Sequence, residues 1–152
     1  MSPGDEFTLS ARLRTMFSID LRSLAALRVL SSLTMLWALI VWAPDLTLFF
    51  TDQGVLHLSD FPERYDYARL SLLRLIDGYW AALTLWFVGF LAALCLLLGY
   101  RARLAALACW IVYLSFVGRN PMIIQGGDIL MPLLLFWMIF LPIGAVYAVD
   151  AA

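Results

Sequence analysis

The residue types that could do chemistry gather in one short segment between two long apolar runs. From Arg119 to Asp128 the chain reads Arg-Asn-Pro-Met-Ile-Ile-Gln-Gly-Gly-Asp. The guanidinium and the carboxylate can hold a polar ligand, and Asn120 and Gln125 would supply further hydrogen-bond donors. Asp77, which ends an earlier polar link, is expected at the same end of the molecule. One hypothesis is therefore a ligand site built from these side chains.

The same segment has a structural interpretation, and the spacing favours it over a ligand site. Pro121 is expected to end the preceding helix, because proline restricts the residue before it. Gly126 and Gly127 permit a tight turn, and Asp128 can then cap the free N–H groups of the next helix. In this interpretation the carboxylate organises the backbone and binds no ligand.

Arg28 is the ionisable residue that lies clearly inside an apolar run. A charge at the membrane centre costs ~2.5–3.5 kcal/mol on insertion scales, so this side chain needs a partner or a route to water. Three interpretations remain open. They are an ion pair with Asp150, a side chain that extends to a lipid phosphate at the interface, and a role in substrate binding or catalysis.

Histidine and cysteine are too few for a structural zinc site or a disulfide framework. The chain has one His and two Cys, and Cys95 and Cys109 fall fourteen positions apart inside apolar runs. Buried thiols usually behave as small apolar side chains. We therefore predict no metal site, and residue types alone name no catalytic residue.

The elements that must position these residues follow from the composition. Of 152 residues, 64% are hydrophobic and 14% are charged, and the mean hydropathy is +0.90. Soluble domains are nearer to about 45–50% apolar, and disordered chains are poorer still, so both classes are excluded. The net charge of −1 offers no basic surface to nucleic acid. The chain is predicted to be an integral membrane protein that contacts the lipid bilayer and other integral membrane subunits.

Four apolar stretches are long enough, or nearly so, to cross a bilayer as helices of about 20 residues. They lack the alternation of barrel strands. The link between the first two contains Asp60-Phe61-Pro62-Glu63, a signal for a helix N-terminus, and Pro142 is expected to kink the fourth stretch. The predicted fold is an all-α integral membrane bundle of four transmembrane helices, with an amphipathic interfacial helix between helices 1 and 2. In a single membrane domain of residues 1–152, we place the spans at 23–43, 78–98, 101–118 and 129–149, and the interfacial helix at 61–77.

The arginines and tryptophans indicate how the spans sit in the membrane. Arg12, Arg14 and Arg22 precede the first span, and Arg101 and Arg103 crowd the short turn between the second and third. Positive residues in short loops mark the cytoplasmic side, so both termini are expected there, in a bacterial inner membrane. The tryptophans fall mostly near span ends, which favours an interfacial belt over stacking on pigment, quinone or lipid.

Several motifs occur together in one order. Residues 19–28 read Ile-Asp-Leu-Arg-Ser-Leu-Ala-Ala-Leu-Arg, and residues 98–104 read Leu-Gly-Tyr-Arg-Ala-Arg-Leu. Arg-Asn-Pro and Gly-Gly-Asp follow within residues 119–128, and residues 141–151 contain Leu-Pro-Ile-Gly and Tyr-Ala-Val-Asp-Ala. Over nearly the whole chain this order resembles the first four helices of the HTTM family, a bacterial membrane domain related to the vitamin K-dependent gamma-carboxylase. The wider DoxX-like group of four-helix membrane proteins is similar in plan.

The resemblance implies a scaffold and carries over no catalytic residue. The catalytic Lys of the carboxylase belongs to a continuation beyond these helices, and this chain contains no Lys. What the resemblance carries over are structural signatures, namely Arg28, the Gly126-Gly127-Asp128 segment and Asp150.

We therefore expect a non-catalytic membrane module that serves as an accessory or structural subunit of a larger energy-converting or enzyme complex. Alanine and glycine on the second and third spans would either allow close contact with partner helices or pack the bundle internally. One alternative is a carboxylase-like or quinone-linked enzyme fragment that requires a second polypeptide. Another alternative is a membrane module that binds lipid or pigment.

Overall fold

The computed structural model describes residues 21–55, 71–76, 78–120, 126–145 and 147–149. Within these ranges every regular element is a helix, which confirms the predicted all-helical class. The elements are α2 (Leu21–Trp42), the 3-10 helix η1 (Ala43–Asp45), α3 (Leu46–Phe50), the 3-10 helix η4 (Leu72–Arg74), α4 (Tyr79–Leu98), α5 (Ala102–Arg119) and α6 (Gly126–Phe140).

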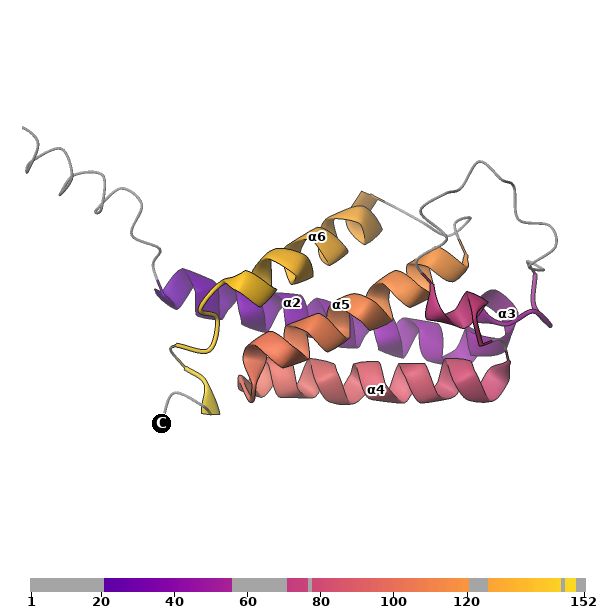
Figure 1. Cartoon of the computed structure of the whole chain (residues 1–152), viewed down its shortest axis with the longest axis horizontal. Helices are drawn as coiled ribbons and strands as arrows, with labels where there is room; N and C mark the ends of the chain where they lie inside the picture. Colours follow the sequence, from indigo (N-terminus) through magenta and orange to yellow (C-terminus); the bar gives the residue numbers. More distant parts are fainter. Residues whose placement is uncertain (1–20, 56–70, 77, 121–125, 146, 150–152) are drawn as a thin grey trace, which may run out of the picture.

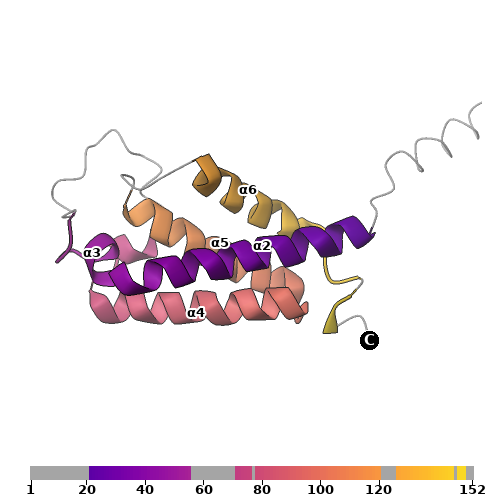
Figure 2. The same cartoon turned by 180° about the vertical axis from the view of Figure 1, so that it is seen from behind.

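Three long helices form the body of the molecule. α4 packs against both α2 and α5, and α6 packs mainly on α5 (Figure 1). Seen from behind, the C-terminal end of α6 lies near α2, whereas the N-terminal end of α6 diverges from α2 (Figure 2). We call the end of the bundle that carries α3 and η4 the α3 end, and the opposite end, with the turn between α4 and α5, the turn end.

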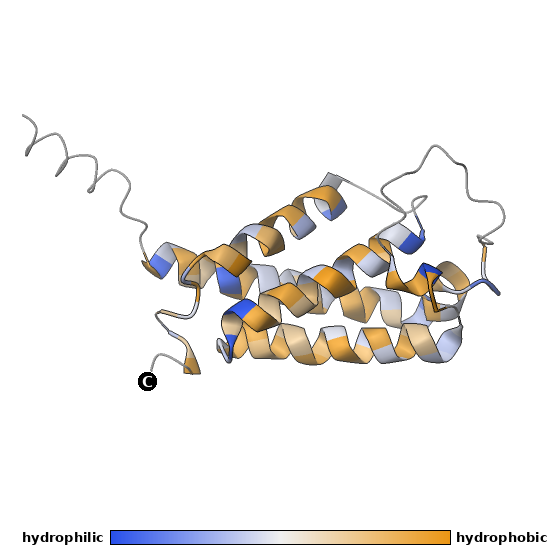
Figure 3. Cartoon of the chain, viewed as in Figure 1, coloured by the Kyte–Doolittle hydropathy of each residue, from blue (hydrophilic) through white to orange (hydrophobic). Residues whose placement is uncertain are grey.

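Three helical segments are long and apolar enough to cross a membrane, in agreement with the first three predicted spans. They are Leu21–Phe50, Tyr79–Leu98 and Ala102–Arg119. The first is longer than the predicted 23–43, because η1 and α3 continue α2. Hydrophilic residues concentrate toward the ends of the bundle and leave its middle apolar (Figure 3). Together these features indicate an integral membrane protein.

The fourth predicted span differs from the structure at both ends. α6 has 15 residues, Gly126–Phe140, whereas the prediction was 129–149. The helix ends before Pro142 because proline disfavours helical geometry at the residue that precedes it, so this proline follows the helix and does not kink it. At about 1.5 Å per residue, α6 is about 22 Å long, which is shorter than the ~30 Å hydrocarbon core of a bilayer.

The predicted interfacial helix at 61–77 does not extend through its C-terminal part. Its residues 61–70 and 77 lie outside the described residues, but Ser71 is extended and only the short η4 follows. The Ser71 hydroxyl donates to the Ser115 carbonyl oxygen (2.5 Å), and the Leu72 N–H donates to the Ser115 hydroxyl (3.3 Å). Contacts with α5 thus take the place of the main-chain hydrogen bonds that a continuous helix would make here.

Small residues let α4 approach its neighbours closely. Ala82, Ala93 and Ala106 are completely buried. A Cβ added at Gly89 would lie 2.6 Å from Val112 Cγ1 on α5. The small residues were expected either to contact partner helices or to pack the bundle internally. These four pack internally, so they are not available to partner helices.

Candidate functional site

A cleft opens between α2 and α6 near the α3 end, where the two helices diverge. Its volume is about 620 Å³, within the range of small-molecule sites. Its walls come from α2, η1, α3, α5 and α6. The lining residues are Thr34, Trp37, Ala38, Val41, Trp42, Asp45, Phe49, Tyr113, Val117, Gly127, Asp128 and Met131.

A hydrogen-bonded polar pair lies in the wall of this cleft. The hydroxyl of Tyr113 on α5 donates to Asp128 Oδ1 on α6 at 2.7 Å. Tyr113 is only 3% exposed, and a buried phenol hydroxyl requires such an acceptor because water does not reach it. The pair therefore links α5 to α6 and holds one carboxylate of the cleft in place.

The start of α6 corrects the predicted capping arrangement. The helix already begins at Gly126, so Asp128 lies within its first turn and not at the cap position before it. Gly126 and Gly127 are helical and lack positive φ, so they do not form the expected tight turn. An acidic side chain in a first turn still interacts favourably with the positive end of the helix dipole.

The cleft combines negative charge with aromatic walls. The charged side chains among its described lining residues are the acids Asp45 and Asp128, and no Lys, Arg or His is among them. The Trp42 ring packs against Tyr113 (5.5 Å between centroids), and Trp37 and Phe49 add further rings to the lining. This arrangement can bind a molecule that is partly apolar and carries a hydrogen-bond donor or a positive charge.

The predicted outer residues Arg119 and Asn120 contact the segment around α3. Arg119 is completely buried, and its Nη2 lies 3.7 Å from Oδ1 of the partly exposed Asp52. The Asn120 side-chain amide donates to the Phe49 carbonyl oxygen (3.3 Å). Both residues thus hold the chain after α2 against the end of α5, which is a structural role. Asp77 and Gln125, the other members of the predicted cluster, lie outside the described residues.

Arg28 lies at the turn end and is only 1% exposed. Its Nη2 donates to the carbonyl oxygen of Tyr147, which follows α6. Its Nη1 occupies the space where a Cβ on Gly99 would lie, so the guanidinium rests against the α4–α5 turn. This burial does not fit the interpretation in which the side chain extends to a lipid phosphate. The pair with Asp150 stays a prediction, because that residue lies outside the described ranges.

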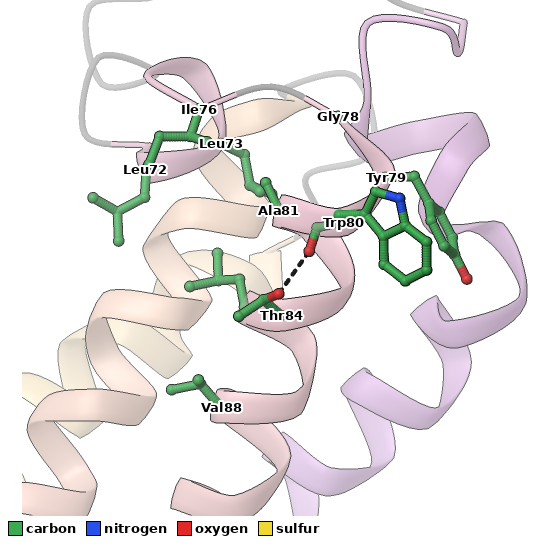
Figure 4. Close-up of a pocket in the computed structure, with 10 residues that line it drawn as sticks. Leu72, Leu73, Ile76, Gly78, Tyr79, Trp80, Ala81, Thr84 and Val88 are labelled. Carbon is green, nitrogen blue, oxygen red and sulfur yellow. Dashed lines mark hydrogen bonds between the residues drawn. The ribbon is translucent and has the colours of Figure 1, made fainter.

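A second hollow lies beside the N-terminal end of α4 (Figure 4). Its volume is about 580 Å³ and its lining is almost entirely apolar. The Thr84 hydroxyl donates to the Trp80 carbonyl oxygen (2.7 Å) within the helix. Since no charged side chain lines it, this hollow lacks the groups that orient a ligand. The lining residues are Leu72, Leu73, Ile76, Gly78, Tyr79, Trp80, Ala81, Thr84, Leu85 and Val88.

The described residues contain no group of three or more His, Cys, Asp or Glu side chains that could hold a metal ion. Cys109 is buried on α5, Cys95 is partly buried on α4, and both are free thiols. They contribute to packing, as expected for thiols on apolar helix faces.

Sequence reasoning missed Tyr113, Asp45 and Asp52 as members of the polar contacts at the α3 end. Tyr113 carried a usable signal, because a hydroxyl inside an apolar span needs a partner.

The interpretation of the tryptophans as an interfacial belt suits Trp80, which is 76% exposed. It does not suit Trp86, whose indole is bonded inside the bundle to a carbonyl of α2.

Comparison of the chain with protein-family models, with curated proteins and with solved structures finds no match. The resemblance to the HTTM family therefore rests on the sequence motifs given above.

Proposed function

We propose that this protein is a non-catalytic membrane module that holds an amphiphilic molecule, such as a lipid, quinone or pigment, in the cleft between α2 and α6. The observation that carries the proposal is the cleft itself, with its volume of about 620 Å³, its aromatic walls and the Tyr113–Asp128 pair. A mostly apolar cavity with a few convergent polar groups is the usual form of a ligand site. Its position between diverging apolar helices suits a ligand that enters from the bilayer.

Two neighbouring glycines provide a matched test of this proposal. Gly127 lines the cleft and Gly126 does not, yet a Cβ at either position meets no atom within 4 Å. Gly127→Phe should fill the cleft, whereas Gly126→Phe should leave it open. We expect mass spectrometry of the purified protein to find a stoichiometric amphiphile in the wild type and in Gly126→Phe, and its loss in Gly127→Phe. Equal amounts in all three proteins would contradict the proposal.

A second candidate is the accessory subunit of a larger membrane complex, and the geometry of α6 favours it. This helix is about 22 Å long and exposes a row of large apolar side chains. A helix shorter than the hydrocarbon core of the bilayer can relieve this mismatch in length by associating with neighbouring helices. The exposed large apolar side chains on α6 are Ile129, Leu130, Leu133, Phe136, Trp137 and Phe140.

Extraction in mild detergent tests this second candidate. The expected result is co-purification with stoichiometric membrane partners, and their loss on replacing Leu133 and Trp137 with Ala. Leu30→Ala on α2 is the control, because Leu30 is comparably exposed but lies on another helix. A clean monomer from the wild type would count against the accessory role.

The scaffold of the HTTM family and the orientation in a bacterial inner membrane remain parts of the proposal. The contact of Arg28 with Gly99 and Tyr147 supports the first, because these residues belong to three of the motifs that the resemblance rests on. The charges support cytoplasmic termini. Among the charged described residues, the turn end carries four arginines and no acid, whereas the α3 end carries two arginines, Arg74 and Arg119, together with Asp45, Asp52 and Asp128.

A further inference from the structure

We propose that the cleft between α2 and α6 selects amphiphiles with a cationic head group, an ammonium in particular. This inference rests on the proposed function, because it names the class of ligand that the same cleft would take. It follows from three features of the lining, namely the sign of its charge, its aromatic rings and the apolar wall beside them.

The charge of the lining is the first feature. Asp45 on η1 and Asp128 in the first turn of α6 both line the cleft, so acidic residues of two different elements border it. The Tyr113 hydroxyl donates to Asp128 Oδ1 at 2.7 Å and so holds this carboxylate at the cleft wall. An anionic head group would meet two like charges here and would be repelled.

The buried arginine of the α3 end does not line the cleft. Arg119 is buried at the end of α5, lies 3.7 Å from Asp52, and is not among the residues that line the cleft. The four arginines of the turn end, Arg22, Arg28, Arg101 and Arg103, also do not line it. A head group in the cleft therefore meets carboxylates without a competing cation in the described lining.

The aromatic rings are the second feature. Trp37, Trp42 and Phe49 line the same cavity as the two carboxylates. The face of an aromatic ring attracts a cation, and tryptophan does so best, which is the basis of aromatic cages for ammonium groups. Trp42 is held in place by its contacts with Tyr113 (5.5 Å) and Phe116 (5.4 Å). The ring is thus positioned before a ligand arrives.

The apolar wall is the third feature, and it explains why the ligand also needs a chain. Ala38 and Val41 on α2, Val117 on α5 and Met131 on α6 complete the lining. These side chains offer an alkyl chain no polar partner, and burial of its methylene groups is favourable. A small hydrophilic amine would leave this wall unoccupied.

Binding measurements with chain-matched probes test the inference. The purified protein is titrated with octyltrimethylammonium, octyl glucoside and octyl sulfate, each below its micelle concentration. We expect the ammonium probe to bind about tenfold more tightly than the neutral probe, and the sulfate probe to bind more weakly than both. Asp45→Asn should reduce the affinity for the ammonium about fivefold and leave the neutral probe unchanged. Gly127→Phe should abolish binding of all three, and Gly126→Phe should not.

A second arm distinguishes the two sources of an ammonium group. Phosphatidylethanolamine and phosphatidylglycerol with identical chains are offered in mixed micelles, and retained lipid is measured by native mass spectrometry. Selective retention of phosphatidylethanolamine, again lost in Gly127→Phe, identifies a lipid head group as the ligand. Selectivity for the octyl ammonium probe without lipid selectivity identifies a free lipophilic amine, and either result supports the inference.

The contradicting results separate this inference from the proposed function. Equal affinities for the three octyl probes, all abolished by Gly127→Phe, would overturn the cationic selectivity and leave the cleft as a ligand site. Binding that Gly127→Phe does not affect would overturn both. Tighter binding of octyl sulfate than of the ammonium would overturn the argument from the two carboxylates.

Discussion

The indole N–H of Trp86 on α4 donates a hydrogen bond to the main-chain carbonyl oxygen of Leu39 on α2, at 2.7 Å. The same ring stacks on Phe90, with 5.3 Å between the centroids. Inside an apolar bundle no water can replace this acceptor, so an unpaired indole N–H would be costly. The contact ties α2 to α4 within stretches that are apolar enough to cross a membrane.

Removal of this hydrogen bond should weaken the α2–α4 contact. Trp86→Phe keeps an aromatic ring against Phe90 but removes the N–H donor. We expect a loss of about 1 kcal/mol in the free energy of unfolding, the usual size of an interhelical hydrogen bond in a membrane. Thermal unfolding in detergent measures it. Trp80→Phe is the control, since Trp80 is largely exposed at the start of α4, and an equal effect of both changes would contradict the prediction.

Gly99 should not tolerate a side chain. It ends α4 with a φ of +76°, and a Cβ there would overlap Arg28 Nη1 and lie 2.8 Å from the Ala148 Cα. We expect Gly99→Ala to cost more than about 2 kcal/mol of stability, because the left-handed backbone and the displaced arginine both oppose it. The melting temperature of the purified protein and its level in the membrane provide the measurement.

Gly126→Ala is the matched control for this prediction. Gly126 is the first residue of α6, has no positive φ, and a Cβ there meets no atom within 4 Å. Alanine should leave stability unchanged or raise it by about 0.5 kcal/mol, because it loses less backbone entropy on folding. A loss of stability in Gly126→Ala as large as that in Gly99→Ala would contradict the prediction that the backbone and contacts of Gly99 exclude a side chain.

Two substitutions at the Tyr113–Asp128 pair distinguish a structural role from catalysis. Tyr113→Phe removes the donor, and we expect it to cost about 1–2 kcal/mol of stability. Asp128→Asn retains an acceptor oxygen for the Tyr113 hydroxyl and should cost less. Protein level in the membrane and thermal unfolding provide the measurements.

The same Asp128→Asn variant tests the enzyme alternative, a carboxylase-like or quinone-linked fragment that needs a second polypeptide. That alternative requires loss of a quinone-dependent activity while the protein accumulates normally. If the wild type has no such activity and Asp128→Asn only lowers the protein level, the structural role is supported.

Cysteine labelling tests the orientation of the helices. Single cysteines replace Arg103 at the turn end and Val55 at the α3 end, both exposed, after Cys95 and Cys109 have been changed to Ala. A membrane-impermeant thiol reagent added to intact cells should label Val55→Cys, and should label Arg103→Cys only after the cells are opened. Labelling of both cysteines from outside, or labelling of Arg103→Cys from outside and of Val55→Cys only after the cells are opened, would contradict the proposed topology.

The three longest helices were predictable because hydropathy acts locally along the chain. The run from Gly78 to Leu98 has no charge in the sequence and appears as α4 (Tyr79–Leu98), and the third predicted span matches α5 within one residue at each end. The end of α6 was less predictable. Apolar residues continue beyond Pro142, so hydropathy alone extends the helix, whereas the backbone restriction imposed by proline ends it at Phe140.

The polar side chains show the limit of sequence reasoning. Arg28, Arg119, Asn120 and Asp128 were recognised as important, but their contacts were not. Three of those contacts come from Tyr147, Asp52 and Tyr113, which lie between 15 and 119 positions away in the sequence. Which residues make these contacts depends on how each helix is rotated about its own axis, and residue types do not encode that rotation directly.

The amino-acid sequence by itself determined that the chain forms apolar helices with its charges toward their ends, because burial of apolar surface is set by residue type and spacing. Only the tertiary structure decided that α6 diverges from α2 and opens a cleft lined by Asp45, Asp128 and aromatic rings. The angle between two helices results from the packing of all their neighbours, among them the small residues that draw α4 close to α5. That angle therefore depends on contacts between residues far apart in the chain.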